Sequence, residues 1–335
     1  MTTKLAINGF GRIGRLVLRS IYESGRNDVS VLAINDLAPP ETNAHLLKYD
    51  SVHGRFPGEV SVKGGKLIVN GHEIVMTQER DPTKLPWKAH DIDVAMECTG
   101  IFTKKEDAMK HITAGAKKVL ISAPATDEDI MVVYGVNHDK LEAKHLVVSN
   151  ASCTTNCLAP VASVLHKAIG IKHGFMTTIH SYTGDQSTVD TAHKDLHRAR
   201  AAAANIIPTS TGAAKAVGKV LPELKGKLDG TAIRVPTPNV SLVDFKFEAN
   251  RATTVEEITK LIMDAANGPM KGILGFYTEP LVSSDFNHDP HSSIFAINET
   301  KVIDGTFVRI MSWYDNEWGF SNRMSDTAVA MAKSR

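Results

Sequence analysis

Cys153 is the residue in this sequence best placed to act as a nucleophile. It lies in the segment 149–157, where serine, asparagine and threonine surround it. An apolar stretch at 145–149 predicts a strand before it, and apolar residues at helical spacing from 158 to 169 predict a helix after it. Short hydroxyl and amide side chains are typical of a helix N-cap, where free backbone N–H groups and the helix dipole favour a thiolate. We therefore expect a reactive thiol at a strand-to-helix junction, although a lone cysteine is more often a buried packing residue.

The three cysteines, Cys98, Cys153 and Cys157, do not form the pattern of a secreted disulfide framework. Cys153 and Cys157 are one helical turn apart, so their side chains could touch. We interpret Cys157 as a packing residue on the same helix, with a disulfide or metal-binding pair as the alternative.

A reactive thiol needs a base or an ion-pair partner, and His180 ends a predicted strand at 174–180. A neighbouring imidazolium lowers the pKa of a cysteine from about 8.5. The chain has 14 histidines, however, and a histidine at a strand end is more often a structural hydrogen-bonding residue. The residues alone do not choose among them.

Anion-binding residues follow this strand. The long polar region 181–210 and the helix start after it contain Thr183, Arg198, Thr211 and Gly212, which are the usual ingredients of a phosphate site. The alternative is an exposed capping loop with solvated arginines. Arg234 lies inside an apolar strand at 230–236, where a buried charge requires an anionic partner from the protein or from a ligand.

A second site is predicted at the start of the chain. A short strand at 4–8 is followed by Gly9, Gly11 and Gly14 and then by an amphipathic helix. This arrangement is typical of a dinucleotide-binding turn, with the pyrophosphate on the helix N-terminus. The next strand ends at Asp36, 22 residues after Gly14, where a carboxylate would bind the adenosine ribose and repel a 2′-phosphate. NAD is therefore favoured over NADP.

The elements that must position these residues indicate an α/β protein. Strands and helices alternate from 92 to 149, which predicts a mainly parallel, doubly wound sheet, with hairpins inserted at 56–79. Because ligands bind at the carboxyl ends of such strands, Thr99 and Ser122 should border the cofactor cleft. After 153 the pattern changes to strands near 240–249, 273–279, 293–298 and 307–314 and a helix from a capping box at Thr254, which predicts a mainly antiparallel α+β domain.

Composition limits the classes of function. The 335 residues are 42% hydrophobic and 22% charged, with 38 basic and 37 acidic residues, so the formal net charge is +1. This length favours two domains, and near-neutral charge gives no support to nucleic-acid binding. No apolar run is long enough for a signal core or a membrane span, so we expect no membrane association and a cytoplasmic location. The segment 285–291 has two histidines and two aspartates, but its spacing matches no strong ligand pattern, and no metal site is predicted.

The segment from Ser149 to Cys157 resembles the active-site signature of the phosphorylating glyceraldehyde-3-phosphate dehydrogenases and their erythrose-4-phosphate relatives, and the likeness covers essentially the whole chain. The resemblance implies an NAD-binding Rossmann domain at 1–152, a catalytic domain at 153–316, a helix at 317–335 that packs back on the first domain, and a homotetramer. It implies that Cys153 is the nucleophile and His180 its activating partner. It also implies that NAD contacts the backbone of Arg12 and Ile13, as well as Asp36, Arg80, Ser122 and Asn316.

The same resemblance assigns the phosphate sites. Thr183 and Arg234 correspond to the site for the substrate's own phosphate, and Ser152, Thr154, Thr211 and Gly212 to the site for attacking phosphate, with Arg198 between them. Three positions depart from common family patterns: His197 replaces one of two paired arginines, Ala192 a proline, and Phe320 a tyrosine.

The substrates implied are glyceraldehyde 3-phosphate and inorganic phosphate. Residues 181–186 and 208–212 resemble the glyceraldehyde-3-phosphate enzymes, whereas 315–324 is close to the erythrose-4-phosphate enzymes. Because the first two stretches are the phosphate-binding ones, we expect oxidation of glyceraldehyde 3-phosphate to 1,3-bisphosphoglycerate through a thiohemiacetal and a thioester on Cys153. Erythrose-4-phosphate dehydrogenase and a Rossmann-fold binding or scaffold protein without turnover are the alternatives.

Overall fold

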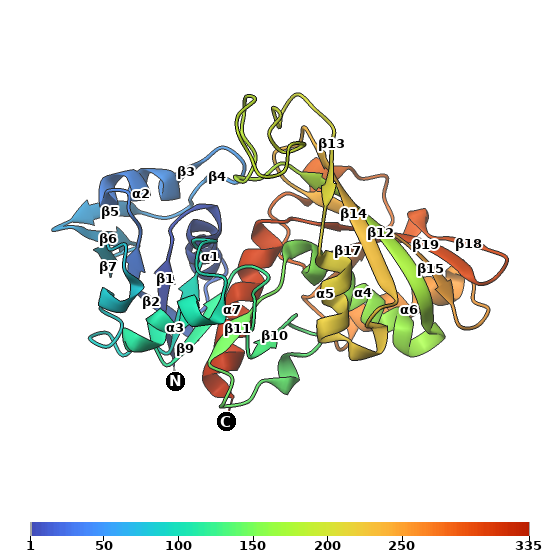
Figure 1. Ribbon diagram of the computed structural model, residues 1–335, viewed down its shortest axis with the longest axis horizontal. Helices are drawn as coiled ribbons and strands as arrows, with labels where there is room; N and C mark the ends of the chain where they lie inside the picture. Colours follow the sequence, from blue (N-terminus) through green and yellow to red (C-terminus); the bar gives the residue numbers. More distant parts are fainter. Residues whose placement is uncertain (1, 335) are drawn as a thin grey trace. The chain divides into compact units, whose positions relative to one another are not determined.

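The computed structural model describes residues 2–334, which divide into two compact units (Figure 1). The first unit contains the chain up to Tyr134, His138–Ala151 and the segment from Ser321 onward. The second contains Gly135–Asn137 and Ser152–Phe320. The junction at Ala151 and Ser152 therefore falls just before the candidate nucleophile.

The first unit is built on a mixed sheet in the order β10-β11-β9-β8-β1-β2-β7-β6-β5. Strands from β10 to β7 run parallel, while β7, β6 and β5 form antiparallel hairpins at one edge. The bounds are β1 Thr3–Asn8, β2 Val29–Asn35, β5 Val60–Lys63, β6 Lys66–Val69, β7 His72–Thr77, β8 Val94–Glu97, β9 Lys118–Ile121, β10 Ile130–Met131 and β11 Val147–Ser149.

Four helices accompany this sheet in the described chain: α1 Arg12–Glu23, α2 Pro40–Lys48, α3 Lys105–Thr113 and α7 Trp318–Lys333. α1 forms because its apolar residues recur at helical spacing, and Leu16, Val17 and Ile21 are buried. From Ser321 onward α7 belongs to the first unit, where Arg26 pairs with Asp326 at 2.5 Å and Thr327 donates to Asn150 at 2.8 Å.

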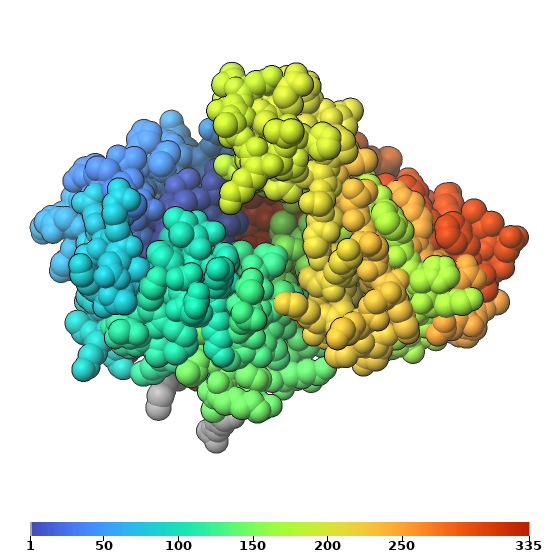
Figure 2. Space-filling model, in the orientation of Figure 1, coloured from blue at the N-terminus to red at the C-terminus, as the bar shows by residue number. Residues whose placement is uncertain are grey.

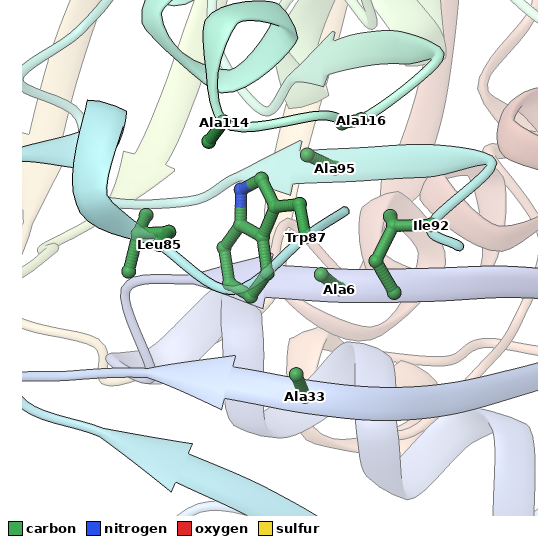
Figure 3. Packing of buried hydrophobic residues seen from close by; sticks show 8 residues of the cluster. All are labelled: Ala6, Ala33, Leu85, Trp87, Ile92, Ala95, Ala114 and Ala116. Atoms are coloured by element: carbon green, nitrogen blue, oxygen red, sulfur yellow. The ribbon is translucent and has the colours of Figure 1, made fainter. Parts of the chain in front are cut away.

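Trp87 fills one side of the parallel sheet. Figure 3 shows its indole ring among Leu85, Ile92 and small alanines of neighbouring strands, all of them buried. Alanines at 6, 33 and 95 leave room for the large ring, so volume is matched across the layer. This packing holds β1, β2 and β8 beside one another.

The second unit contains a mainly antiparallel sheet in the order β13-β14-β12-β15-β19-β17-β16, with β18 paired to β19. Only the pairs β12–β14 and β16–β17 are parallel within the described residues. The bounds are β12 Ile171–Ser181, β13 Ile207–Ser210, β14 Leu228–Val235, β15 Ser241–Ala249, β16 Leu274–Tyr277, β17 Ser293–Ala296, β18 Lys301–Ile303 and β19 Phe307–Tyr314.

Three helices of the described chain lie wholly in this unit: α4 Cys153–Ile169, α5 Ala213–Val220 and α6 Val255–Asn267. α4 contacts α5, α6 and the strands β12, β15, β17 and β19, so the helix that begins at Cys153 is held on several sides. Residues 182–206 contain neither helix nor strand and form a yellow-green lobe on the surface in Figure 2.

Smaller elements complete the chain. β3 Tyr49–Asp50 pairs with β4 Gly54–Arg55, and the 3₁₀ turns are Pro82–Lys84, His138–Lys140, Pro222–Leu224, Ser283–Phe286 and Ile297–Glu299. No helix within residues 2–334 combines the length and apolarity that crossing a bilayer requires.

The predicted fold class is confirmed: a doubly wound α/β unit is joined to an α+β unit with a mainly antiparallel sheet. The hairpins expected at 56–79 are present, and Thr254 caps α6 as its sequence predicts. Within the alternating stretch from 92 to 149, β10 is a very short strand, since it pairs only through Ile130 and Met131. α2 was not predicted.

Candidate active site and cofactor cleft

The thiol of Cys153 lies at the first residue of α4, as the sequence predicts. Ser152 is the N-cap, and its hydroxyl accepts the Thr155 N–H at 3.0 Å. Ala151, which precedes it, is buried and has a φ of +58°, a conformation that non-glycine residues rarely adopt. The chain therefore makes a sharp, strained junction that delivers Cys153 to the helix start, and backbone strain of this kind is concentrated at functional sites.

His180 faces this thiol from the end of β12. The distance from Cys153 Sγ to His180 Nε2 is 3.5 Å. His180 Nδ1 lies 2.7 Å from the carbonyl oxygen of Ser181, and a carbonyl only accepts hydrogen bonds, so Nδ1 carries a proton. In the neutral ring Nε2 is then a free base that can take the thiol proton.

Burial governs the protonation of both groups. It raises the pKa of the Cys153 thiol, against the opposing effects of the Arg234 charge and of hydrogen bonds at the start of α4. Burial and then the charge of Arg234 lower the pKa of His180 to about 3. The hydrogen bonds at the start of α4 do favour the thiolate, as expected, but desolvation of the buried thiol outweighs them. A charge on either group alone is disfavoured, but proton transfer from Sγ to Nε2 creates both charges together, so the two groups titrate as a pair.

Arg234 brings a cation to the same site. Its Nη1 donates to Thr183 Oγ1 and to the Ser181 carbonyl, each at 3.2 Å. Among the residues described, no carboxylate pairs with this guanidinium, and its Nε is buried without a hydrogen-bond partner. Burial lowers the pKa of Arg234, which marks an incompletely compensated charge. Such a cation requires an anionic ligand, and the predicted neighbours Thr183 and Arg234 do lie together.

The remaining predicted phosphate residues are arranged less uniformly. Thr154 is buried, with its hydroxyl 2.8 Å from the Tyr314 hydroxyl. Arg198 donates to Asp185 at 2.8 Å and to Thr209 at 3.0 Å, so its charge is already partly compensated. Gly212 is exposed and precedes the first residue of α5, Ala213. The Thr211 hydroxyl accepts the Ala213 N–H at 3.2 Å.

Tyr314 is a site residue that sequence reasoning missed. Its hydroxyl lies 2.8 Å from those of both Thr154 and Thr178, and its ring meets that of His180 edge-on at 5.9 Å. Burial raises the pKa of Tyr314 well above its usual value, so the hydroxyl stays protonated. It links the helix that carries Cys153 to the strand that carries His180. The only signal in the sequence was its position two residues before Asn316.

Cys157 behaves as a packing residue, as predicted. It is buried and free, and its Sγ lies 3.5 Å from Ser293 Oγ and 3.6 Å from the Ser312 carbonyl. Burial raises the pKa of Cys157 to about 12, which leaves it an inert thiol. Within residues 2–334 no group of three or more histidine, cysteine, aspartate or glutamate residues is arranged to hold a metal ion, and His291 pairs with Asp289.

The first unit contains a cleft of about 360 Å³ at the carboxyl ends of its parallel strands. Its walls include the glycine turn, the ends of β1, β2 and β8, and the loop after β7; the lining residues are Asn8, Gly9, Gly11, Asn35, Asp36, Leu37, Glu79, Arg80, Cys98, Thr99, Ile101 and Phe102. Gly9, Gly11, Asp36, Arg80 and Thr99 are thus brought together as predicted.

The glycines of the turn have two different roles. A Cβ on Gly14 would lie 2.2 Å from the Gly9 carbonyl oxygen, so Gly14 is needed for close packing inside the turn. A Cβ on Gly11 would meet nothing within 4 Å and would project into open space at the start of α1. That open space at the N-terminus of α1 fits a pyrophosphate.

Asp36 is held in place by the same turn. Its Oδ2 accepts the Phe10 N–H at 2.8 Å and its Oδ1 accepts the Ala38 N–H at 2.9 Å. The carboxylate is therefore oriented before any ligand arrives, and the donor set of the cleft fits the adenosine half of NAD. Arg80 is exposed at the rim.

Four predicted cofactor residues of the first unit lie outside the lining of this cleft, namely Arg12, Ile13, Gly14 and Ser122. Arg12 and Ile13 form the first turn of α1, where the Arg12 side chain pairs with Asp50 at 2.9 Å. Ser122 follows β9, and its N–H donates to the Glu97 carbonyl at 3.0 Å. Asn316 belongs to the second unit, where the hydroxyls of Ser181 and Ser241 donate to its Oδ1.

A buried polar network supports the floor of the cleft. One oxygen of Glu97 accepts the N–H and hydroxyl of Thr99, and the other accepts Asn8 Nδ2 at 2.6 Å and lies 2.9 Å from His111 Nε2. The Trp87 indole N–H, which can only donate, points at His111 Nδ1 at 3.0 Å, so His111 is a neutral ring that donates from Nε2. Sequence reasoning missed this network.

The doubly wound fold and its cleft are those of an NAD-dependent oxidoreductase. Comparison with known families agrees. Residues 3–105 match the glyceraldehyde 3-phosphate dehydrogenase NAD-binding domain, and residues 152–316 match the C-terminal domain of the same enzymes. The chain belongs to the glyceraldehyde-3-phosphate dehydrogenase family.

Curated relatives match over nearly the full length. The chain is 67% identical over 333 residues to the glyceraldehyde-3-phosphate dehydrogenase of Xanthobacter flavus, with 99% of each chain covered. It is 68% identical over 333 residues to that of Cereibacter sphaeroides, again with 99% of each chain covered. Identity to the enzyme of Geobacillus stearothermophilus is 58% over 333 residues and 99% of each chain.

Proposed function

We propose that this protein catalyses the NAD-dependent, phosphorylating oxidation of glyceraldehyde 3-phosphate to 1,3-bisphosphoglycerate. The observation that carries the proposal is the pairing of Cys153 Sγ with a neutral, Nδ1-protonated His180 at 3.5 Å, beside an Arg234 charge that has no carboxylate partner among residues 2–334. A thiol, a base and an anion site are the groups that this chemistry requires.

Acylation begins when the Cys153 sulfur bonds to the aldehyde carbon and its proton passes to His180 Nε2. The resulting oxyanion takes a hydrogen bond from the Cys153 backbone N–H and the proton from His180, which gives a neutral thiohemiacetal. His180 then withdraws the hydroxyl proton as hydride leaves the same carbon, and a thioester on Cys153 remains. Bound NAD supplies the hydride acceptor.

Inorganic phosphate then attacks the thioester carbon, and the Cys153 sulfur leaves as the acyl phosphate forms. Ser152, Thr154, Thr211, Gly212 and Arg198 are proposed to hold the attacking phosphate, and Thr183 and Arg234 the phosphate of the substrate. The burial of Thr154 and the Asp185 partner of Arg198 make those two the weaker candidates among this set. Gly9, Gly11, Arg12, Ile13, Gly14, Asp36, Arg80, Thr99, Ser122 and Asn316 are proposed to hold NAD.

We further propose that the two compact units correspond to an NAD-binding domain at 1–152, completed by the helix at 317–335, and a catalytic domain at 153–316. We propose a cytoplasmic homotetramer. Large apolar side chains on the surface of the loop region support assembly: Val189 is 68%, Leu196 80% and Ile206 71% exposed. Light scattering after size-exclusion chromatography tests the assembly, and a monomer would contradict it.

The function is tested with the purified protein, NAD and glyceraldehyde 3-phosphate, with and without inorganic phosphate. We expect NADH to accumulate only when phosphate is present. The same assay with erythrose 4-phosphate separates the two substrates by their kcat/KM values. A higher kcat/KM for erythrose 4-phosphate, or full turnover without phosphate, would contradict the proposal.

A further inference from the structure

Asn316 lies against two buried serine hydroxyls. Ser181 Oγ, at the end of β12, lies 2.8 Å from Asn316 Oδ1, and Ser241 Oγ, at the start of β15, lies 2.9 Å from the same atom. Ser181 and Ser241 are at most 1% exposed, and Asn316 is 5% exposed. The amide is thus enclosed on its oxygen side by two hydroxyl groups that water does not reach.

The hydrogen-bond donors decide which way this amide points. Ser241 Oγ accepts the Ser181 backbone N–H at 3.1 Å, so its own proton is directed to Asn316 Oδ1. If the amide were flipped, the hydroxyl protons of Ser181 and Ser241 would face the NH₂ group and lose Oδ1 as their acceptor. Within the described chain the one remaining acceptor for each hydroxyl is the oxygen of the other, at 3.4 Å. At least one buried hydroxyl proton would then lack an acceptor, which costs about 1 kcal/mol or more. Asn316 therefore presents its NH₂ group, and not its oxygen, on the side away from the serines.

The backbone around this contact is fixed from both sides. Val240 has a φ of +68°, which is a strained conformation for a β-branched residue, and it sets the direction of Ser241. Next to it Asn239 Nδ2 donates to Asp315 at 2.8 Å, and Asp315 accepts the N–H groups of Glu317 and Trp318 at the start of α7. Residues 239–241 and 315–316 are therefore tied together by side-chain contacts at two successive points.

Ser181 also orients the base. Its carbonyl oxygen accepts the Nδ1 proton of His180, while its hydroxyl donates to Asn316. One residue thus fixes both the imidazole and the amide. Replacing the Ser181 side chain by alanine keeps the carbonyl, so the two contributions can be separated by experiment.

We infer that Ser181 and Ser241 are positioning residues that hold Asn316 as an obligate hydrogen-bond donor to the carbonyl oxygen at the 3-position of the nicotinamide ring. The inference rests on the proposed role of Asn316 in holding NAD. An amide fixed in this way selects for a strong acceptor on the ring. It discriminates against a thiocarbonyl at the same position, because sulfur is a weak acceptor.

The test compares the binding of NAD and of thionicotinamide adenine dinucleotide by calorimetry, without turnover. The proteins are the full-length wild type, Ser181→Ala, Ser241→Ala and the double variant. Ser163→Ala is the matched control, because Ser163 is equally buried on α4 and its hydroxyl has no hydrogen-bond partner within residues 2–334. We expect the wild type and the control to prefer NAD by about tenfold in Kd, which corresponds to about 1.4 kcal/mol.

In the double variant we expect this preference to fall to about twofold, through a weaker Kd for NAD and a nearly unchanged Kd for the thio analogue. A preference that stays at the wild-type value in the double variant would overturn the inference. If the double alanine variant does not fold, the double variant Ser181→Cys with Ser241→Cys replaces it, because a thiol is a weak hydrogen-bond donor of similar size, and the same two outcomes decide. Asn316→Ala distinguishes the proposed cofactor role of Asn316 from the positioning role of the two serines. If it leaves both Kd values unchanged, the proposed cofactor role of Asn316 fails; if it weakens NAD binding while the serine variants do not, only the inference about the serines fails.

Discussion

His180 donates its Nδ1 proton to the carbonyl of its own neighbour Ser181 at 2.7 Å, which leaves Nε2 to face Cys153. The base is therefore oriented by backbone and needs no carboxylate partner. A backbone carbonyl does not titrate, so the tautomer of His180 is the same across the working pH range. Nε2 of His180 is therefore held as the proton acceptor for the thiol.

Replacing His180 by asparagine should expose the effect of burial on the thiol. Burial raises the pKa of Cys153, and without a partner to take the proton the thiolate appears only as the pH rises well above neutrality. We expect the rate of alkylation by iodoacetamide at pH 7 to fall by roughly tenfold or more, and to recover as the pH is raised. Alkylation that follows the wild-type pH profile would show that His180 does not control the thiol.

Cys153→Ser and Cys157→Ser should differ sharply in activity. We expect Cys153→Ser to lose turnover by about 10³-fold or more, because a hydroxyl is a far weaker nucleophile and leaving group. The hydrogen-bond partners of Cys157 Sγ in the described structure are Ser293 and backbone carbonyls, so Cys157→Ser should keep activity within about twofold. Comparable losses in the two variants would remove Cys153 from its assigned role.

Gly11→Ala and Gly14→Ala separate cofactor binding from folding. A Cβ on Gly14 collides with the Gly9 carbonyl, so we expect the free energy of unfolding to fall by about 2 kcal/mol or more. A Cβ on Gly11 meets no protein atom, so stability should change by less than about 1 kcal/mol while the Kd for NAD rises about tenfold. Urea denaturation and calorimetry measure the two quantities, and unchanged NAD binding in Gly11→Ala would place the pyrophosphate elsewhere.

Glu97→Gln should destabilise the first unit. One carboxylate oxygen of Glu97 accepts from Thr99, and the other accepts from Asn8 and His111. In glutamine one of these oxygens is replaced by an NH₂ group, which cannot accept a hydrogen bond and must face two N–H or O–H donors. We expect a loss of about 2 kcal/mol or more in the free energy of unfolding. The exposed Glu59→Gln is the control and should change it by less than about 0.5 kcal/mol. Equal effects would show that the network adds nothing to stability.

Local patterns in the sequence were sufficient for much of the fold. The strand, glycine turn and helix at 3–23 and the junction at Cys153 appear as predicted, because hydrophobic periodicity and capping residues act over short distances. α2 was not predicted, because it begins at a pair of prolines and buries only Asn43 and Leu47, so its apolar periodicity is weak.

The contacts and protonation states of the site residues could be predicted from the sequence to a lesser extent. His180 was chosen by family resemblance, since a strand end does not by itself distinguish it from the other histidines. The contacts of Asn316 with Ser181 and Ser241 join residues 135 and 75 positions apart, so pairing through the sheet creates them. Burial, which sets the protonation of Cys153, is a property of the packed structure and has no local signature.

The position of α7 bears on how the protein is made. Residues from Ser321 onward supply Asp326 to Arg26 and Thr327 to Asn150, yet they are synthesised after the entire second unit. During translation the first unit cannot complete its fold until these residues have been synthesised, so the surface that they cover stays exposed. The second unit can complete its fold as soon as it leaves the ribosome. The first unit therefore begins synthesis first but finishes folding last. Until it has folded, we expect chaperones to bind mainly to the dinucleotide-binding unit.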